Sequence, residues 1–155
     1  MGINVQQIVG GPAALTFNSV DLGSTIGGVV IKWNNEHNKV MVDQSTMPVK
    51  KLAKLKEASV EFVLAEASDA NLQLALGSST TGFGGNNATP EHALGVAGPG
   101  PNGGNRDFTF HKASVEGSSE YKNERGEVVG LKVVMECVAD LTKNNDEQLF
   151  TWVST

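Results

Sequence analysis

The chain has 155 residues, of which 39% are hydrophobic and 19% charged, which is typical of one globular domain with a real core. Twelve basic and seventeen acidic side chains give a net charge of −5, which argues against tight binding to duplex DNA. A single cysteine, Cys137, excludes an internal disulfide framework and a zinc site with several cysteines. Without a long apolar run or a signal-peptide pattern, we expect a soluble chain from a reducing compartment, with no membrane contact.

The first part of the chain predicts short strands. Residues 1–11 lack periodicity and are expected to form an N-terminal arm, and Ala13–Phe17 is the first candidate strand. Two runs rich in β-branched residues follow, Val29–Asn34 and Lys39–Asp43. Because the Asn-rich segment Asn34–Asn38 lies between them, the pattern predicts a hairpin that turns there.

The middle of the chain holds a basic segment, a strand and a helix. Pro48–Lys56 fits either a helical stripe or an extended loop, and both remain open. Ala58–Ala65 alternates as a strand with Val60, Phe62 and Leu64 facing inward. Ser68–Gly77 predicts one short helix, because Ser68 is a good N-cap and Gly77 a good C-terminal residue; its apolar face is expected to hold Leu72, Ala75 and Leu76.

Residues 77–106 contain nine of the eighteen glycines and three prolines, and are expected to form one long loop insertion. The segment lacks the spacing of a phosphate-binding loop. Two interpretations remain for it: an outward decoration, or a segment that becomes ordered on assembly.

Three further strands are predicted in the last third, over Asp107–Ala113, Glu127–Leu141 and Leu149–Val153, with a turn-like stretch at 117–126. The total is seven or eight strands and one helix. We therefore predict a single domain over 1–155 of the mainly β class, a β-sandwich or partial barrel with one short flanking α-helix.

The candidate catalytic residues form no constellation. His37, His92 and His111 share no metal-ligand spacing, no serine-hydrolase motif occurs, and Cys137 lies in the middle of a strand among apolar residues. We therefore expect no enzyme, no cofactor and no metal site.

Several segments of the chain resemble the tail tube (major tail) proteins of long-tailed bacteriophages. The residues that carry the resemblance are Asp21-Leu22-Gly23-Ser24-Thr25-x-Gly27-Gly28-Val29, Val40-x-Val42-Asp43-Gln44, Val60-x-Phe62-x-Leu64-Ala65-Glu66, Leu74-Ala75-Leu76-Gly77, Phe108-Thr109-Phe110-His111-Lys112-Ala113 and Glu147-Gln148-Leu149-Phe150. The resemblance covers about residues 12–76 and 107–150, and the loop 77–106 departs from it.

The resemblance implies a structural virion protein that assembles in the host cytoplasm. Six copies would close a ring around a shared inner β-barrel, and stacked rings would form the hollow tail tube through which the genome leaves. The implied partners are further copies, the tape measure, tail terminator and baseplate or tip proteins, and DNA in transient, non-specific passage. Two alternatives remain: a secreted injection-machine tube protein, and a capsid-decorating or binding β-sandwich whose binding loop is 77–106.

Two surfaces follow from this reading. An acidic wall lets DNA slide, and its candidate residues are Asp43, Glu61 and Glu136. The contact between rings is assigned to the basic segment and the residues before it, because lysines would face the acidic surface of the next ring. Its candidate residues are Asp43, Gln44, Met47, Lys50, Lys51, Lys54 and Lys56. The alternative for these lysines is a solvated basic face.

Overall fold

The computed structural model describes residues 12–78, 82–85, 89–123, 125–126 and 130–155. The expected N-terminal arm over 1–11 lies outside the described residues, and so do the first three residues of the strand expected over Glu127–Leu141.

The described chain is mainly β. The elements in chain order are β1 (Ala14–Phe17), β2 (Val20–Asp21), β3 (Thr25–Val40), β4 (Lys50–Leu64), α1 (Asp69–Leu76), β5 (His92–Pro99), the 3₁₀ turn η2 (Pro101–Gly103), β6 (Asn105–Val115), β7 (Glu120–Lys122), β8 (Gly130–Cys137) and β9 (Phe150–Ser154).

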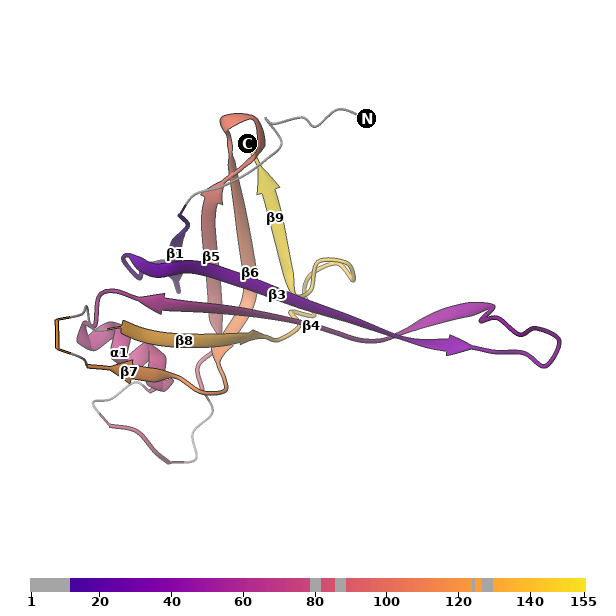
Figure 1. The fold of residues 1–155 in the computed structure, drawn as a ribbon, viewed down its shortest axis with the longest axis horizontal. Helices are drawn as coiled ribbons and strands as arrows, with labels where there is room; N and C mark the ends of the chain where they lie inside the picture. Colours follow the sequence, from indigo (N-terminus) through magenta and orange to yellow (C-terminus); the bar gives the residue numbers. More distant parts are fainter. Residues whose placement is uncertain (1–11, 79–81, 86–88, 124, 127–129) are drawn as a thin grey trace.

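All strand pairs are antiparallel, and the sheet runs in the order β2-β1-β5-β6-β8-β4-β3 without closing. Two short strands join it from the side, β7 on β8 and β9 on β6. Strands β5, β6 and β9 rise steeply in Figure 1, whereas β3, β4 and β8 run nearly horizontally, so the sheet folds over on itself. The predicted class, a β-sandwich or partial barrel with one short helix, is confirmed.

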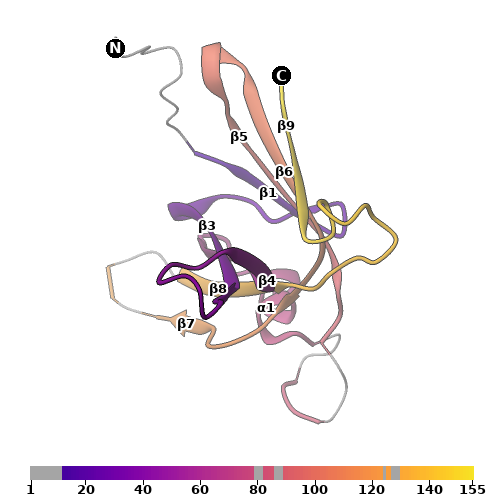
Figure 2. The ribbon, with the colours of Figure 1, turned by 90° about the vertical axis from the view of Figure 1, so that its right-hand side faces the viewer.

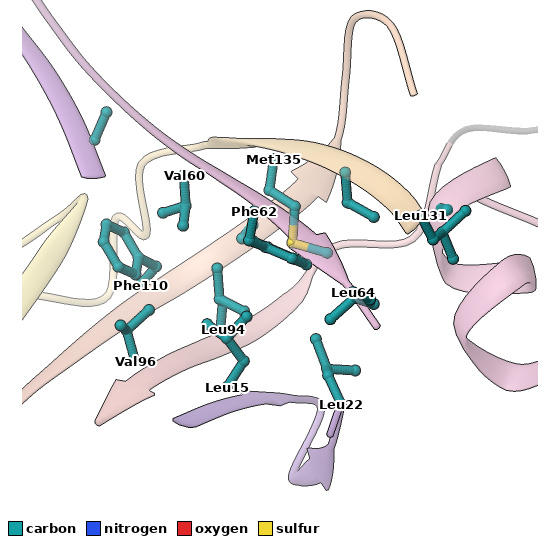
Figure 3. Packing of buried hydrophobic residues seen from close by; sticks show 14 residues of the cluster. Leu15, Leu22, Val60, Phe62, Leu64, Leu94, Val96, Phe110, Leu131 and Met135 are labelled. Atoms are coloured by element: carbon teal, nitrogen blue, oxygen red, sulfur yellow. The ribbon is translucent and has the colours of Figure 1, made fainter. Parts of the chain in front are cut away.

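The core lies where these two parts of the sheet face each other. Fourteen buried hydrophobic residues form one cluster, seen from close by in Figure 3. Strand β4 contributes the three residues predicted to face inward, Val60, Phe62 and Leu64, and β8 contributes Leu131, Val133 and Met135 beside them. Burying such side chains stabilises the fold by about 1.5–3 kcal/mol each.

The helix begins and ends as its caps predict. The hydroxyl of Ser68 accepts a hydrogen bond from the backbone N–H of Asn71, and Gly77 adopts a left-handed φ of 64°. Of the three residues expected on its apolar face, Ala75 is buried, whereas Leu72 and Leu76 are half-buried.

The prediction of a hairpin that turns at Asn34–Asn38 is wrong. Residues 25–40 form one long strand, β3, and the asparagines pair with residues 52–57 of β4. The connection between the two strands is residues 41–49. Asn is typical of turns locally, but here cross-strand pairing with a distant segment outweighs that preference.

Neither interpretation of Pro48–Lys56 holds, because β4 begins at Lys50 and is paired through this basic segment. The pairing is interrupted by a β-bulge: Glu36 faces Leu55 but His37 faces Ala53, so Lys54 is an extra residue on β4.

The prediction of one long loop over residues 77–106 is also wrong for the second half of that range. Residues 92–99 form β5, whose Leu94 and Val96 are buried in the core. Gly95 lets β1 and β5 approach closely, because a Cβ there would lie 2.6 Å from the hydroxyl oxygen of Thr16 and would force that side chain to move.

Candidate assembly surface

The outer part of the β3–β4 pair, residues 34–57, stands away from the rest of the molecule (Figure 1). We call it the projecting hairpin, and its connection 41–49 the tip. Strand β8 pairs with β4 only from Ser59 to Leu64, so within the described chain both edges of the projecting hairpin are free. A two-stranded hairpin without a third strand or a helix against it is marginally stable in water.

All seven residues predicted to form the contact between rings lie on the projecting hairpin. The tip holds Asp43, Gln44 and Met47; Lys50 and Lys51 follow it at the start of β4, and Lys54 and Lys56 lie nearer the body. The structure therefore places these candidates on one element, three of them in its connection and the four lysines on strand β4.

The lysines of the projecting hairpin differ in their surroundings. The bulge puts Lys54 beside Glu36, and its Nζ lies 3.7 Å from the Glu36 carboxylate. Lys39 and Lys51 lie directly opposite each other, a like-charge pair that destabilises the hairpin. Among the described residues, no carboxylate lies within ion-pair distance of Lys39, Lys50 or Lys51.

The projecting hairpin also exposes apolar side chains. Met47 is 70% exposed, and the set of large apolar residues that remain accessible is Met41, Val42, Met47, Val49, Leu52 and Leu55. Exposed apolar residues gathered on one element, rather than scattered singly, mark an interaction surface.

Two of the three predicted wall residues share one face of the sheet. Glu136 faces Ser59 across the β4–β8 pair, and Glu61 faces Val134, so both carboxylates lie on the side opposite the core. Glu61 also forms an ion pair with Lys32, whose Nζ lies 3.0 Å from the Glu61 Oε2. Asp43, the third candidate, lies far from them at the tip.

Glu136 belongs to a group of carboxylates on this face. A side-chain hydrogen bond with Glu116 raises the pKa of Glu136, and burial and the negative charges of Glu116 and Glu57 raise it further. Three carboxylates together make this part of the face acidic, a poor surface for holding phosphates.

A groove lies at the root of the projecting hairpin, with a volume of about 530 Å³. Two tryptophans line this groove. Trp33 of β3 lies opposite Ala58 of β4, and Trp152 of β9 lies opposite Phe108 of β6. The two indoles are 69% and 58% exposed. The guanidinium of Arg106 lies 5.4 Å from the centre of the Trp152 ring and restricts its position.

The sequence did not predict this groove. Trp33 and Trp152 come from strands that are not paired with each other. They reach one surface only because the sheet folds over on itself, and no spacing in the sequence predicts that they lie close together.

The candidate catalytic residues stay apart. His37 is on the projecting hairpin, His92 packs edge-on against Phe17, and His111 is on β6. Burial, with a contribution from Glu136, raises the pKa of the Cys137 thiol to about 12, which makes the thiolate scarce at neutral pH. In the portion of the chain that the structure describes, no three His, Cys, Asp or Glu side chains form a group that could hold a metal ion.

Comparison with known proteins gives no match to a protein-family model, and none to a curated protein. Among the described residues, no helix is both long enough and apolar enough to cross a membrane.

Proposed function

We propose that this chain is a structural subunit that assembles with further copies into hexameric rings stacked as a hollow tube, the conduit for DNA in a long-tailed phage. The observation that carries the proposal is the projecting hairpin: it exposes apolar side chains and carries an opposed lysine pair. Such an element is unfavourable in an isolated chain and becomes favourable when another copy covers it.

The open sheet supports the same assembly. The outer edge of β3 and that of β9 have no partner strand among the described residues, so each offers backbone groups to another copy. Ring closure pairs such edges, as closure does in any β-barrel. The face with Glu61 and Glu136 would line the interior, where negative charge lets DNA slide.

Electron microscopy of the purified chain tests this proposal. We expect negatively stained images to show hollow tubes or stacked rings. Replacing Lys50, Lys51 and Lys54 with Glu is expected to abolish tubes, because the projecting hairpin would then repel the acidic body of the next copy. Circular dichroism of this variant should stay that of a folded β protein.

The images also decide between the alternatives. Free rings that never lengthen would favour a secreted injection-machine tube protein, and dispersed monomers or trimers at high concentration would favour a binding or decorating module. Tubes formed unimpaired by the lysine variant would reject the assignment of these lysines to the contact between rings.

A further inference from the structure

The groove at the root of the projecting hairpin has the chemistry of a receptor for another protein segment. Its apolar floor is formed by Trp33, Phe108, Leu149, Phe150 and Trp152. Its rim is polar and includes Glu57 and Asp146, with Lys56 as a basic member. An aromatic floor inside a polar rim is typical of the centre of a protein–protein interface.

The connection from β8 to β9 adds negative charge beside the rim. Residues 138–149 carry Asp140, Asp146 and Glu147 against one basic residue, Lys143. Figure 2 looks along the projecting hairpin from its tip and shows this connection (yellow) to the side of it. A segment that combines apolar side chains with lysines would therefore match both the floor and the rim.

The tip and the residues after it are such a segment. Met41, Val42, Met47 and Val49 are exposed there, and Lys50 and Lys51 follow without a carboxylate partner among the described residues. Methionine side chains are flexible and make favourable contacts with aromatic rings.

A tip cannot enter the groove of its own chain. Six residue steps along β3 lead from Asn34, in the groove, to Val40, the last residue before the tip, which is a span of about 20 Å at about 3.3 Å per residue. The hairpin runs outward over this whole length (Figure 1), so the matching segment has to come from a second copy.

We propose that the groove between Trp33 and Trp152 receives the tip of a second copy, with Met47 on the tryptophans and Lys50 and Lys51 against Asp146 and Glu147. This inference rests on the proposed self-assembly and names its receptor surface. The contact joins two different surfaces, so it is heterologous, and its repetition generates a ring or a filament.

Tryptophan fluorescence tests the proposal, because both tryptophans of the chain line the groove. We expect emission from dilute protein to be red-shifted and quenched by iodide. It should shift to the blue, with loss of quenching, as concentration rises and copies associate. A blue-shifted emission that is independent of concentration would mean that the groove is filled within one chain, by residues 1–11 for example, and would overturn the proposal.

Substitutions in the groove and on the segment that enters it test the two sides of the contact separately. Trp152→Ala removes one of the two tryptophans of the floor and leaves Trp33 as the probe; the concentration needed for association should rise about tenfold or more. Lys50→Glu with Lys51→Glu should have a similar effect. The matched control is Lys112→Glu with Lys132→Glu, which has the same net charge and alters β6 and β8 instead; its association should be unchanged.

Mixing two variants that each carry one introduced cysteine, both made in a Cys137→Ala background, identifies the partners directly. Met47→Cys labels the tip and Asn145→Cys labels the rim; oxidising the mixture should give a disulfide-linked heterodimer. Replacing the rim variant by Ser119→Cys, on the β6–β7 connection, should abolish that product. A dominant Met47→Cys homodimer would show a tip-to-tip contact and overturn the proposal.

The outcomes for the groove and for the tube differ. Wild-type tubes together with unimpaired tubes from Trp152→Ala would reject the groove and leave the tube proposal intact. A wild-type chain that never associates would reject both.

Discussion

Asn71 is the buried polar residue on which several elements depend. Its side-chain amide donates hydrogen bonds to the carbonyls of Leu22 and Glu66, at 3.1 and 2.8 Å, while its backbone N–H meets the Ser68 cap. One side chain thereby joins the first turn of α1 to the chain after β2 and the chain after β4. At 6% exposure it has little access to water.

Replacing Asn71 with Ala should destabilise the fold by about 1–3 kcal/mol, because both carbonyls lose their donor. Urea unfolding, followed by circular dichroism, measures the change. Gln73→Ala, at a half-buried position in the same helix, is the control and should change stability by about 0.5 kcal/mol or less. A loss at Asn71 no larger than that at Gln73 would contradict this role.

Glu136 makes stability depend on pH. Its pKa is raised in the folded chain by Glu116 and by burial, so the native state holds this proton more readily than the unfolded chain does. The resulting stabilisation is complete below the ordinary value of 4.5 and is lost as the pH rises through the raised pKa.

Glu136→Gln should therefore be more stable than the wild type at pH 7 and equal to it at about pH 4. Since Glu136 is exposed, we expect a gain of about 0.5 kcal/mol or less. Urea unfolding at both pH values measures it, with Glu91→Gln as a control of equal charge change. A gain that is the same at both pH values would rule out this explanation.

At the scale of elements, the sequence predicted what local patterns determine. The inward residues of β4 and β8 alternate with polar ones, and Ser68 and Gly77 bound the helix, so these elements were confirmed. β5 was missed because glycine and proline interrupt its alternation around Leu94 and Val96. A close approach to β1, which no sequence pattern shows, explains Gly95.

The projecting hairpin was missed for a different reason. It packs against no core of its own, so its residues show no inward–outward alternation that marks a strand. Its length and register come from pairing between segments up to about twenty residues apart, such as Asn35 with Lys56. The candidate contact residues, which were predicted from the resemblance and from the run of lysines, all fall on this hairpin.

Hydrogen exchange should distinguish the projecting hairpin from the body. In dilute protein, we expect amides of residues 34–57 to exchange fast, whereas those of Ser59–Leu64, between β3 and β8, stay protected. Assembly should protect residues 34–57 and leave Ser59–Leu64 unchanged. Equal protection of both segments in dilute protein would mean that the hairpin is stable without another copy.

At the scale of the whole molecule, charge is divided between the hairpin and the body. Residues 34–57 carry five basic and three acidic side chains, and the rest of the chain carries seven and fourteen. Two bodies therefore repel each other, while a hairpin and a body attract. Electrostatics favours contacts between a hairpin and a body over contacts between like surfaces, which orients one copy on the next.

The opposed Lys39 and Lys51 have a second consequence, for the period before assembly begins. A long bare strand edge is a template for indiscriminate stacking into amyloid-like fibrils. Uncompensated positive charge at the far end of the hairpin disfavours parallel stacking of identical hairpins, because each lysine would lie next to the same lysine of the neighbouring copy. The same repulsion that weakens the hairpin thus acts as a gatekeeper against aggregation while newly made chains accumulate.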